Sequence, residues 1–186
     1  MTKSKRKDFS FEIEIPSGIE FNLDDNIVTM KKEGKELTRM VPGEVNLKKE
    51  GNKLVLSVKK AGKNDKRKFG TAKSHIKNMV EGLGKEWEYE LEVCNVHFPI
   101  TAVFDKAKLE IHVKNMLGEK SPRIIKVRKN VDVEIKSPKI KLKSFDLEAV
   151  GQTAADLEKF TKIRNRDRNK FQDGIFITKK PGVNFI

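Results

Sequence analysis

The sequence predicts an α+β protein made of two tandem copies of a small β-sheet, each with one packed helix. Three observations support this fold class: apolar residues alternate with a period of two along most of the chain, the period becomes helical in two segments, and the same order of elements occurs twice. A period of two is typical of strands with one buried face, and a helical period is typical of a helix packed on such a sheet.

The first half opens with a strand in which Phe9, Phe11, Ile13 and Ile15 share one face. Further strands are expected at residues 27–31, 36–41, 45–47, 54–58 and 87–93, separated by turns rich in Gly, Pro and Asn. Helical spacing of Ala72, Ile76, Met79, Val80 and Leu83 predicts a helix over residues 71–81. Gly82 and Gly84 end it.

The second half follows the same order. Strands are expected at residues 96–104, 109–113, 124–127, 131–135 and 140–142. A helix then opens at residues 151–153, with Thr153 and Asp156 as a capping-box-like pair. Its inner face would be Leu157, Phe160 and Ile163, and a strand at 175–178 closes the unit.

The two halves match in order and in some residues. Pro16 pairs with Pro99, Gly34 with Gly118, 45–47 with 131–133, 53–56 with 139–142, and 70–72 with 151–154. Because order and spacing agree together, we favour an internal duplication over coincidence among common turn residues. The expected domains are residues 1–94, with a basic N-terminal end, and residues 95–186.

The charge balance points to an anionic partner. The 186 residues include 40 Lys and Arg against 27 Asp and Glu, a net charge of +13, and such a surplus needs counter-charge. Nucleic acid is the first candidate and an anionic membrane the second, although no apolar run approaches the ~20 residues that span a bilayer. The basic start shows no signal-peptide pattern. Cys94 is the only cysteine, which excludes an internal disulfide and fits a reducing cytoplasm.

Catalytic and metal chemistry find little support. His75, His97 and His112 are scattered without ligand spacing, and no pair of carboxylates stands out as general acid and base. We therefore expect no catalytic residues, no metal, no cofactor and no small-molecule substrate. An RNA-acting enzyme remains the remote alternative, and it would need a cluster of His, Asp or Glu beside a basic face.

Four basic clusters favour a nucleic-acid interface instead. They are Lys3, Lys5, Arg6 and Lys7; a group within 59–68, expected in a hairpin-like loop before the first helix; Lys136, Lys139, Lys141 and Lys143; and the segment 159–180. In the last cluster, Arg164, Arg166 and Arg168 would share one face if the segment is extended. Arginine matches phosphate oxygens bidentately. With one Trp and one Tyr, shape recognition of structured RNA is favoured over stacking on unpaired bases.

The same residues carry a family resemblance. The duplicated unit, Phe69-Gly70-Thr71, His97-Phe98-Pro99, the segment 115–120 and the segment 163–177 resemble the large-subunit ribosomal protein six family, in its archaeal and eukaryotic branch (protein nine in eukaryotes). The resemblance implies two similar α/β domains, a ribosome-associated location in the cytoplasm and no catalytic activity. It implies binding of large-subunit rRNA, mainly by the second domain, near the sarcin–ricin loop. Neighbouring ribosomal proteins at the stalk base and translation factors would lie nearby.

This resemblance and the charge pattern together predict the rRNA contacts. They are Lys162, Arg164, Arg166, Arg168, Lys170, Lys179 and Lys180, followed by Lys136, Lys139, Lys141 and Lys143. A free-standing module that binds structured RNA outside the ribosome is the alternative.

Overall fold

The chain folds into two compact units, Met1–Lys85 and Glu86–Ile186. The computed structural model describes residues 7–184, with side chains described for 7–183. The basic residues Lys3, Lys5 and Arg6 therefore lie outside the described residues. No helix in the described part is both long and apolar enough to span a membrane.

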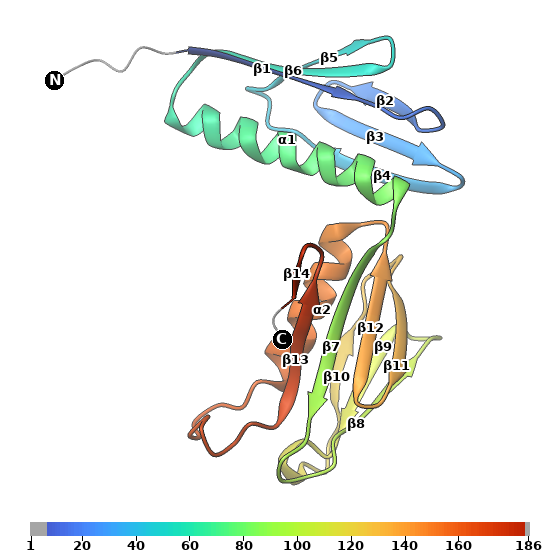
Figure 1. The fold of residues 1–186 in the computed structure, drawn as a ribbon, viewed down its shortest axis with the longest axis vertical. Coiled ribbons are helices and arrows are strands. Elements are labelled where there is room, and N and C mark those ends of the chain that lie inside the picture. The colour runs from blue at the N-terminus through green and yellow to red at the C-terminus, as the bar shows by residue number, and fades with distance from the viewer. Residues whose placement is uncertain (1–6, 185–186) are drawn as a thin grey trace, which may run out of the picture. The chain divides into compact units, whose positions relative to one another are not determined.

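Unit 1 contains two antiparallel sheets and one helix (Figure 1). Its elements are β1 (Lys7–Glu14), β2 (Glu20–Asp24), β3 (Ile27–Lys32), β4 (Lys35–Met40), β5 (Asn46–Glu50), β6 (Lys53–Ala61) and α1 (Lys63–Gly84). One sheet has the order β1-β6-β5 and the other has the order β2-β3-β4. The alternation in β1 is confirmed, because Phe9, Phe11 and Ile13 are half-buried whereas the residues between them are exposed.

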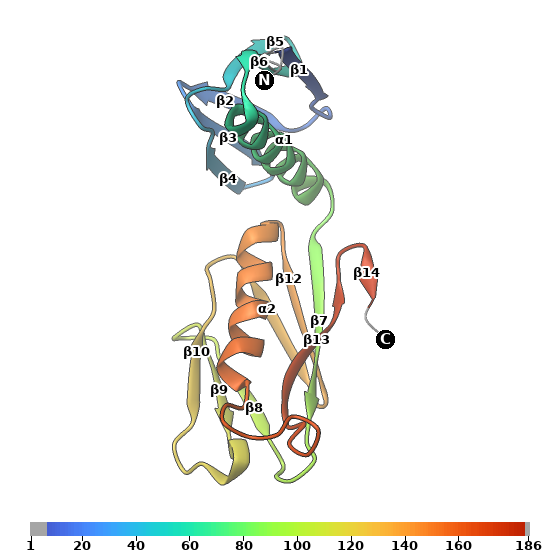
Figure 2. The ribbon, with the colours of Figure 1, turned by 90° about the vertical axis from the view of Figure 1, so that its left-hand side faces the viewer.

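Unit 2 repeats this plan and adds to it (Figure 2). Its elements are β7 (Trp87–Cys94), β8 (Thr101–Asp105), β9 (Glu110–Lys114), the 3₁₀ turn η1 (Met116–Gly118), β10 (Arg123–Lys126), β11 (Asp132–Lys136), β12 (Lys139–Ser144), α2 (Leu147–Thr161), β13 (Gly174–Lys180) and β14 (Val183–Asn184). The sheets have the orders β10-β9-β8 and β11-β12-β7-β13-β14. The predicted α+β fold of two similar units is confirmed.

The register of the central strands shows how closely the units correspond. Ile13 of β1 lies opposite Leu54 of β6, and Leu91 of β7 lies opposite Ile140 of β12. Leu54 and Ile140 are the residues that the sequence repeat aligns. Strand β7 therefore takes the place of β1, and β12 takes the place of β6.

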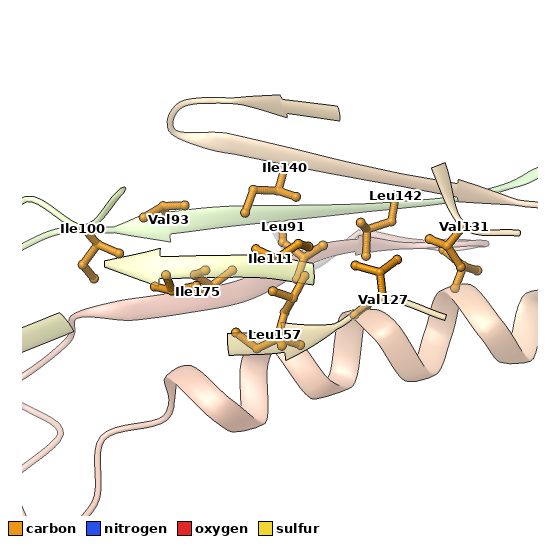
Figure 3. Packing of buried hydrophobic residues seen from close by; sticks show 14 of the residues in the cluster. Leu91, Val93, Ile100, Ile111, Val127, Val131, Ile140, Leu142, Leu157 and Ile175 are labelled. Atoms are coloured by element: carbon orange, nitrogen blue, oxygen red, sulfur yellow. The ribbon is translucent and has the colours of Figure 1, made fainter. Parts of the chain in front are cut away.

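The core of unit 2 lies between α2 and the sheets (Figure 3). Leu91, Ile111, Ile140 and Leu157 are fully buried there. Burying a side chain of this size contributes about 1.5–3 kcal/mol. This packing makes α2 and the sheets a firm base for the segment that follows the helix.

Several predicted boundaries are wrong. Helix α1 begins at Lys63, so the basic group at 59–68 forms the end of β6 and the first turns of α1 rather than a loop. The backbone N–H of Gly62 donates to Asp65 Oδ2 at 2.8 Å, which ties down the start of α1. Residues 96–100 are a loop instead of a strand, and β2 was not predicted.

Helix α2 also begins earlier than predicted, at Leu147, with Asp146 accepting the backbone N–H of Glu148 at 3.0 Å. Thr153 is consequently inside the helix and not at its cap, where its hydroxyl donates to the Ala149 carbonyl at 2.8 Å. Leu157 is buried as predicted, but Phe160 is 53% exposed because it lies in the last turn.

The division between the units falls earlier than the boundary expected between residues 94 and 95. Strand β7 is the reason, because it pairs with β12 on one side and β13 on the other. It is the central strand of the five-stranded sheet of unit 2.

Candidate nucleic-acid interface

The basic segment between α2 and β13 is an irregular loop of residues 162–173, called here the basic loop. Its two ends are fastened together by the buried hydroxyl of Thr161. This hydroxyl donates to the Leu157 carbonyl at 2.8 Å and accepts the backbone N–H of Ile175 at 3.1 Å. The basic loop therefore leaves the fold and returns to it at fixed points.

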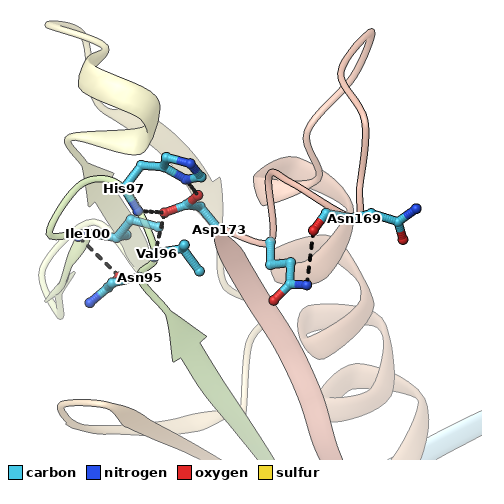
Figure 4. Close-up of polar contacts among 7 residues, drawn as sticks. Asn95, Val96, His97, Ile100, Asn169 and Asp173 are labelled. Atoms are coloured by element: carbon cyan, nitrogen blue, oxygen red, sulfur yellow. Dashed lines mark hydrogen bonds and ion pairs between the residues drawn. The ribbon is translucent and has the colours of Figure 1, made fainter.

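A buried carboxylate ties the basic loop to the loop between β7 and β8 (Figure 4). Asp173 is 2% exposed. Its Oδ1 accepts the backbone N–H groups of Val96 at 2.8 Å and His97 at 2.9 Å, and its Oδ2 lies 2.7 Å from His97 Nδ1. These three contacts join segments that are far apart in the sequence.

Opposing effects set the pKa of Asp173. Burial raises the pKa, but the hydrogen bonds from the His97 backbone, the His97 ring and the Val96 backbone outweigh burial and lower the pKa from 3.8 to about 2. Asp173 is therefore ionised at neutral pH, and both of its carboxylate oxygens are engaged by the Val96 and His97 groups inside the fold. It does not neutralise the cations of the basic loop.

Stacked rings extend this anchor toward the loop surface. The His97 and Phe171 rings stack with centroids 4.8 Å apart, and the Arg166 guanidinium lies 4.9 Å from the Phe171 centroid. A guanidinium over an aromatic face is stabilised by about 0.5–1 kcal/mol at an exposed site. The stack thus restricts where Arg166 can point.

The backbone of the basic loop is turned rather than extended. Asn165 has a φ of 58°, and the backbone carbonyl of Asp167 accepts the backbone N–H groups of Lys170 and Phe171 at 3.2 and 2.9 Å. Arg164, Arg166 and Arg168 consequently do not alternate along a strand. Arg164 and Arg166 line one hollow, whereas Arg168 lines another beside Phe171 and Phe176.

The first hollow is a basic depression of about 630 Å³ at the end of α2. Its lining residues are Leu117, Glu119, Arg123, Lys159, Phe160, Lys162, Ile163, Arg164 and Arg166. Its single carboxylate, Glu119, is engaged by Arg123 at 2.5 and 2.8 Å. The hydrogen bond from Arg123 lowers the pKa of Glu119, which therefore stays charged.

Apart from Arg123, the cations around this hollow have no acidic partner among the described residues. Among the described residues, Lys159, Lys162, Arg164 and Arg166 make no ion pair, and neither do Arg168 and Lys170 in the rest of the loop. Arg123 also donates to the Phe160 carbonyl at 2.7 Å, so it covers the end of α2. The basic loop presents fixed but uncompensated positive charge, which is what a phosphate backbone attracts.

The lysines of the sheet are in a different situation. Lys141 lies 3.6 and 3.5 Å from Glu88 and Glu90, and Lys143 lies 3.8 Å from Glu88. Lys136 pairs with Glu134 at 2.5 Å, and Lys179 pairs with Glu90 at 3.7 Å. Exposed ion pairs of this kind are worth about 0–1 kcal/mol. These lysines lie on a surface of mixed charge, so each would have to leave its carboxylate partner to contact a phosphate.

The remaining predicted residues lie at the margins of these two groups. Lys139 is exposed on β12, across from Glu92 of β7. Lys180, at the end of β13, is half-buried. The predicted set of RNA contacts thus comprises a cluster around the basic loop and a separate row on the sheet.

Sequence reasoning missed the residues that position the loop. Asp173, His97 and Phe171 hold it, and Arg123 and Lys159 complete the hollow. A signal existed for Asp173, since it is an acidic residue directly before an apolar strand in a segment otherwise rich in basic residues. No sequence signal placed Arg123 beside α2, because that contact spans 37 positions.

The described residues offer no group of three or more His, Cys, Asp or Glu that could hold a metal ion. The arrangement can bind anions by charge and by hydrogen bonds from guanidinium groups.

Comparison with known proteins gives consistent matches. The family model described as ribosomal protein L6 matches residues 15–85 and 106–174, one segment in each unit. Three curated relatives illustrate the similarity, each named large ribosomal subunit protein uL6. That of Haloarcula marismortui is 35% identical over 91% of this chain and 95% of its own length. That of Methanobrevibacter smithii is 38% identical over 91% and 94%. That of Staphylothermus marinus is 42% identical over 70% and 71%.

Proposed function

This chain belongs to the ribosomal protein L6 family, and on that premise we propose that it is a structural protein of the large ribosomal subunit that grips rRNA with the basic loop of unit 2. The observation that carries the proposal is the absence of ion pairs, within the described residues, on the cations of the basic loop and on Lys159, which lines the hollow beside them. Five such cations, Lys162, Arg164, Arg166, Arg168 and Lys170, are held on a loop fastened at Thr161 and Asp173, and Lys159 lies beside it in the last turn of α2.

Fixed geometry matters for this function. A flexible basic tail loses conformational freedom when it binds, whereas a fastened loop pays less of that entropy cost. Arg164 and Arg166 line the same hollow, so they can engage phosphates on one stretch of backbone. Each bidentate contact adds directionality that a lysine does not supply.

We test the proposal with the double variant Arg164→Ala/Arg166→Ala. Binding to a large-subunit rRNA fragment that contains the sarcin–ricin loop is measured by fluorescence anisotropy between 50 and about 300 mM salt. We expect a loss of affinity of about tenfold or more and a salt slope reduced by about two, one for each phosphate contact removed. The melting temperature should stay unchanged.

Matched variants separate charge from position. Lys106→Ala/Lys108→Ala removes the same charge from the exposed turn between β8 and β9, and we expect less than about a threefold effect. Arg164→Lys/Arg166→Lys keeps the charge and should give an intermediate affinity. Equal losses in the loop and turn variants would show that only net charge matters and would refute the assignment of the site.

The finer placement follows the family resemblance. We propose that the contact lies near the sarcin–ricin loop and the stalk base, with neighbouring ribosomal proteins and translation factors close by. Chemical footprinting of large subunits with and without this protein tests it, and protection confined to other rRNA regions would contradict it. If the protein fails to co-sediment with large subunits through a salt wash, it acts instead as a free-standing RNA-binding module.

A further inference from the structure

The two units differ at one edge of their main sheets. In unit 2, β13 pairs with the outer side of β7. In unit 1, the corresponding strand β1 pairs only with β6 among the described residues, so the sheet stops there. The duplication therefore leaves in unit 1 an edge that unit 2 fills with a strand.

The backbone groups at this edge can be assigned from the ladder. The backbone N–H of Ile15 donates to the Asn52 carbonyl at 3.0 Å, so Ile15 faces β6. Backbone groups of an antiparallel strand alternate in direction. The N–H and C=O groups of Ile13 and Phe11 therefore also face β6, and those of Ser10 and Glu12 face the open edge.

The apolar row of β1 is less covered than its counterpart in unit 2. Leu91 of β7 is 0% exposed, whereas Ile13, which takes the same place in the repeat, is only partly buried. In unit 2, Ile177 of β13 lies opposite Leu91. Among the described residues of unit 1, no strand pairs with the outer side of β1, so no residue takes this place beside Ile13.

Lysine side chains from α1 cover the next two positions. Lys66 Nζ lies 5.1 Å from the Phe9 ring centroid, and Lys73 Nζ lies 3.7 Å from the Phe11 ring centroid. Neither lysine has an ion pair within the described residues. Two positive charges thus flank an open edge at the position where α2 contacts β13 in unit 2.

We propose that the open edge of β1 is a docking site for another protein, which adds an extended, acidic segment as an antiparallel strand. The antiparallel direction is that of β13 on β7. Backbone pairing supplies affinity, and alternate side chains supply specificity. An apolar residue of the partner would cover Ile13, and acidic residues on the same face would meet Lys66 and Lys73.

The edge is unsuited to RNA. A sugar–phosphate backbone cannot continue a peptide ladder, and Glu12 and Glu14 project from the outer face of β1, where only Lys53 offsets them. Edge strands are often protected by charges and bulges. In the described part of β1 the register shift lies between Lys7 and Phe9, and residues 9–14 keep a regular ladder.

The test variant is Ser10→Pro, which removes a backbone N–H that faces the open edge without taking a hydrogen bond from β6. Proline is tolerated at such edge positions. Ser10→Ala, which keeps the N–H, is its matched control. We expect Ser10→Pro to bind the isolated rRNA fragment like wild type but to be lost from large subunits at least about fivefold more readily during a salt wash.

Hydrogen exchange and crosslinking identify the partner. In purified large subunits, β1 amides should exchange at least about tenfold more slowly than in the free protein. A photo-crosslinker at position 10 should join an extended acidic segment of another protein. Unchanged exchange, crosslinks only to rRNA, or crosslinks to a second copy of this chain would each overturn the proposal. The docking site rests on the proposed function in one respect: the partner is sought among the proteins of the large ribosomal subunit.

A second pair of variants guards against misfolding of the proline variant. Lys66→Glu/Lys73→Glu should weaken retention in subunits, whereas Lys106→Glu/Lys108→Glu in unit 2 makes the same change in net charge and should not. Equal behaviour of the two charge variants would refute the acidic partner. Loss of binding to the isolated rRNA fragment by wild-type protein would instead contradict the proposed function.

Discussion

Replacing Asp173 with Asn should destabilise unit 2 and loosen the basic loop. The carboxylate accepts three hydrogen bonds from Val96 and His97. An amide keeps an oxygen for the two backbone N–H groups, but it loses the negative charge, and its nitrogen cannot accept the His97 ring N–H. Lowering the pKa from 3.8 to about 2 corresponds to about 2 kcal/mol of stability at neutral pH. We therefore expect Asp173→Asn to lower the free energy of unfolding by about 2 kcal/mol.

The pH dependence of stability makes this prediction specific. A carboxyl whose pKa is depressed in the fold stabilises the protein fully above its unfolded pKa of 3.8, and the contribution is lost as pH falls through about 2. The contribution of the Asp173 carboxylate to the stability difference between wild type and Asp173→Asn should thus still be fully present at about pH 5. It should shrink toward pH 2.

Denaturant unfolding followed by the fluorescence of Trp87 measures this difference, because Trp87 is the only tryptophan and lies in β7 of unit 2. Asp167→Asn is the control: this exposed carboxylate lies in the same loop and accepts the backbone N–H of Asn169 at 3.0 Å. We expect the control to change stability by less than about 0.5 kcal/mol. A stability difference for Asp173→Asn that is small, or that does not vary between pH 5 and pH 2, would refute the reasoning.

Three further predictions follow from the packing of unit 2. Leu157→Ala leaves a cavity in the core between α2 and the sheets and should cost about 3 kcal/mol in denaturant unfolding, whereas Glu158→Ala on the same helix should cost less than about 0.5 kcal/mol. Gly174→Ala should lower the free energy of unfolding by about 1–3 kcal/mol, because Gly174 has a φ of 152° and an added Cβ would lie 3.2 Å from the Phe176 ring. Gly182→Ala is the control for crowding, because a Cβ added at Gly182 would have no neighbouring atom within 4 Å. Phe171→Ala removes the ring between His97 and Arg166 and should weaken rRNA binding several-fold with fold retained, whereas Phe171→Tyr should bind like wild type in the anisotropy assay; equal affinity of the two variants would contradict a positioning role for the stack.

Sequence patterns predicted the fold because most strands have one buried and one solvated face. They failed where that contrast is weak. Strand β2 has few apolar residues, with only Phe21 buried, and its charged neighbours conceal the alternation. The first turns of α1 are solvated, so Lys63 to Lys68 show no apolar period even though lysine and arginine are good helix formers.

The site was harder to predict because its geometry depends on long-range contacts. The sequence showed that residues 159–180 are basic, but the shape of the loop depends on Asp173 meeting His97 across 76 positions. A left-handed Asn165 also broke the expected alternation of Arg164 and Arg166. The ion pairs of the sheet lysines depend on strand register, which composition does not reveal.

The place of β13 in the unit 2 sheet bears on how the protein is made. Strand β7 is translated first in unit 2, yet the strand on its outer side is translated after α2, some eighty residues later. Until residues 174–180 have emerged, β7 keeps one side open and Asp173 cannot close the basic loop. Unit 1, whose elements are contiguous in sequence, can fold before that point. The surface proposed to hold rRNA is therefore among the last parts of the chain to form. An incompletely synthesised protein would lack the completed RNA-binding surface.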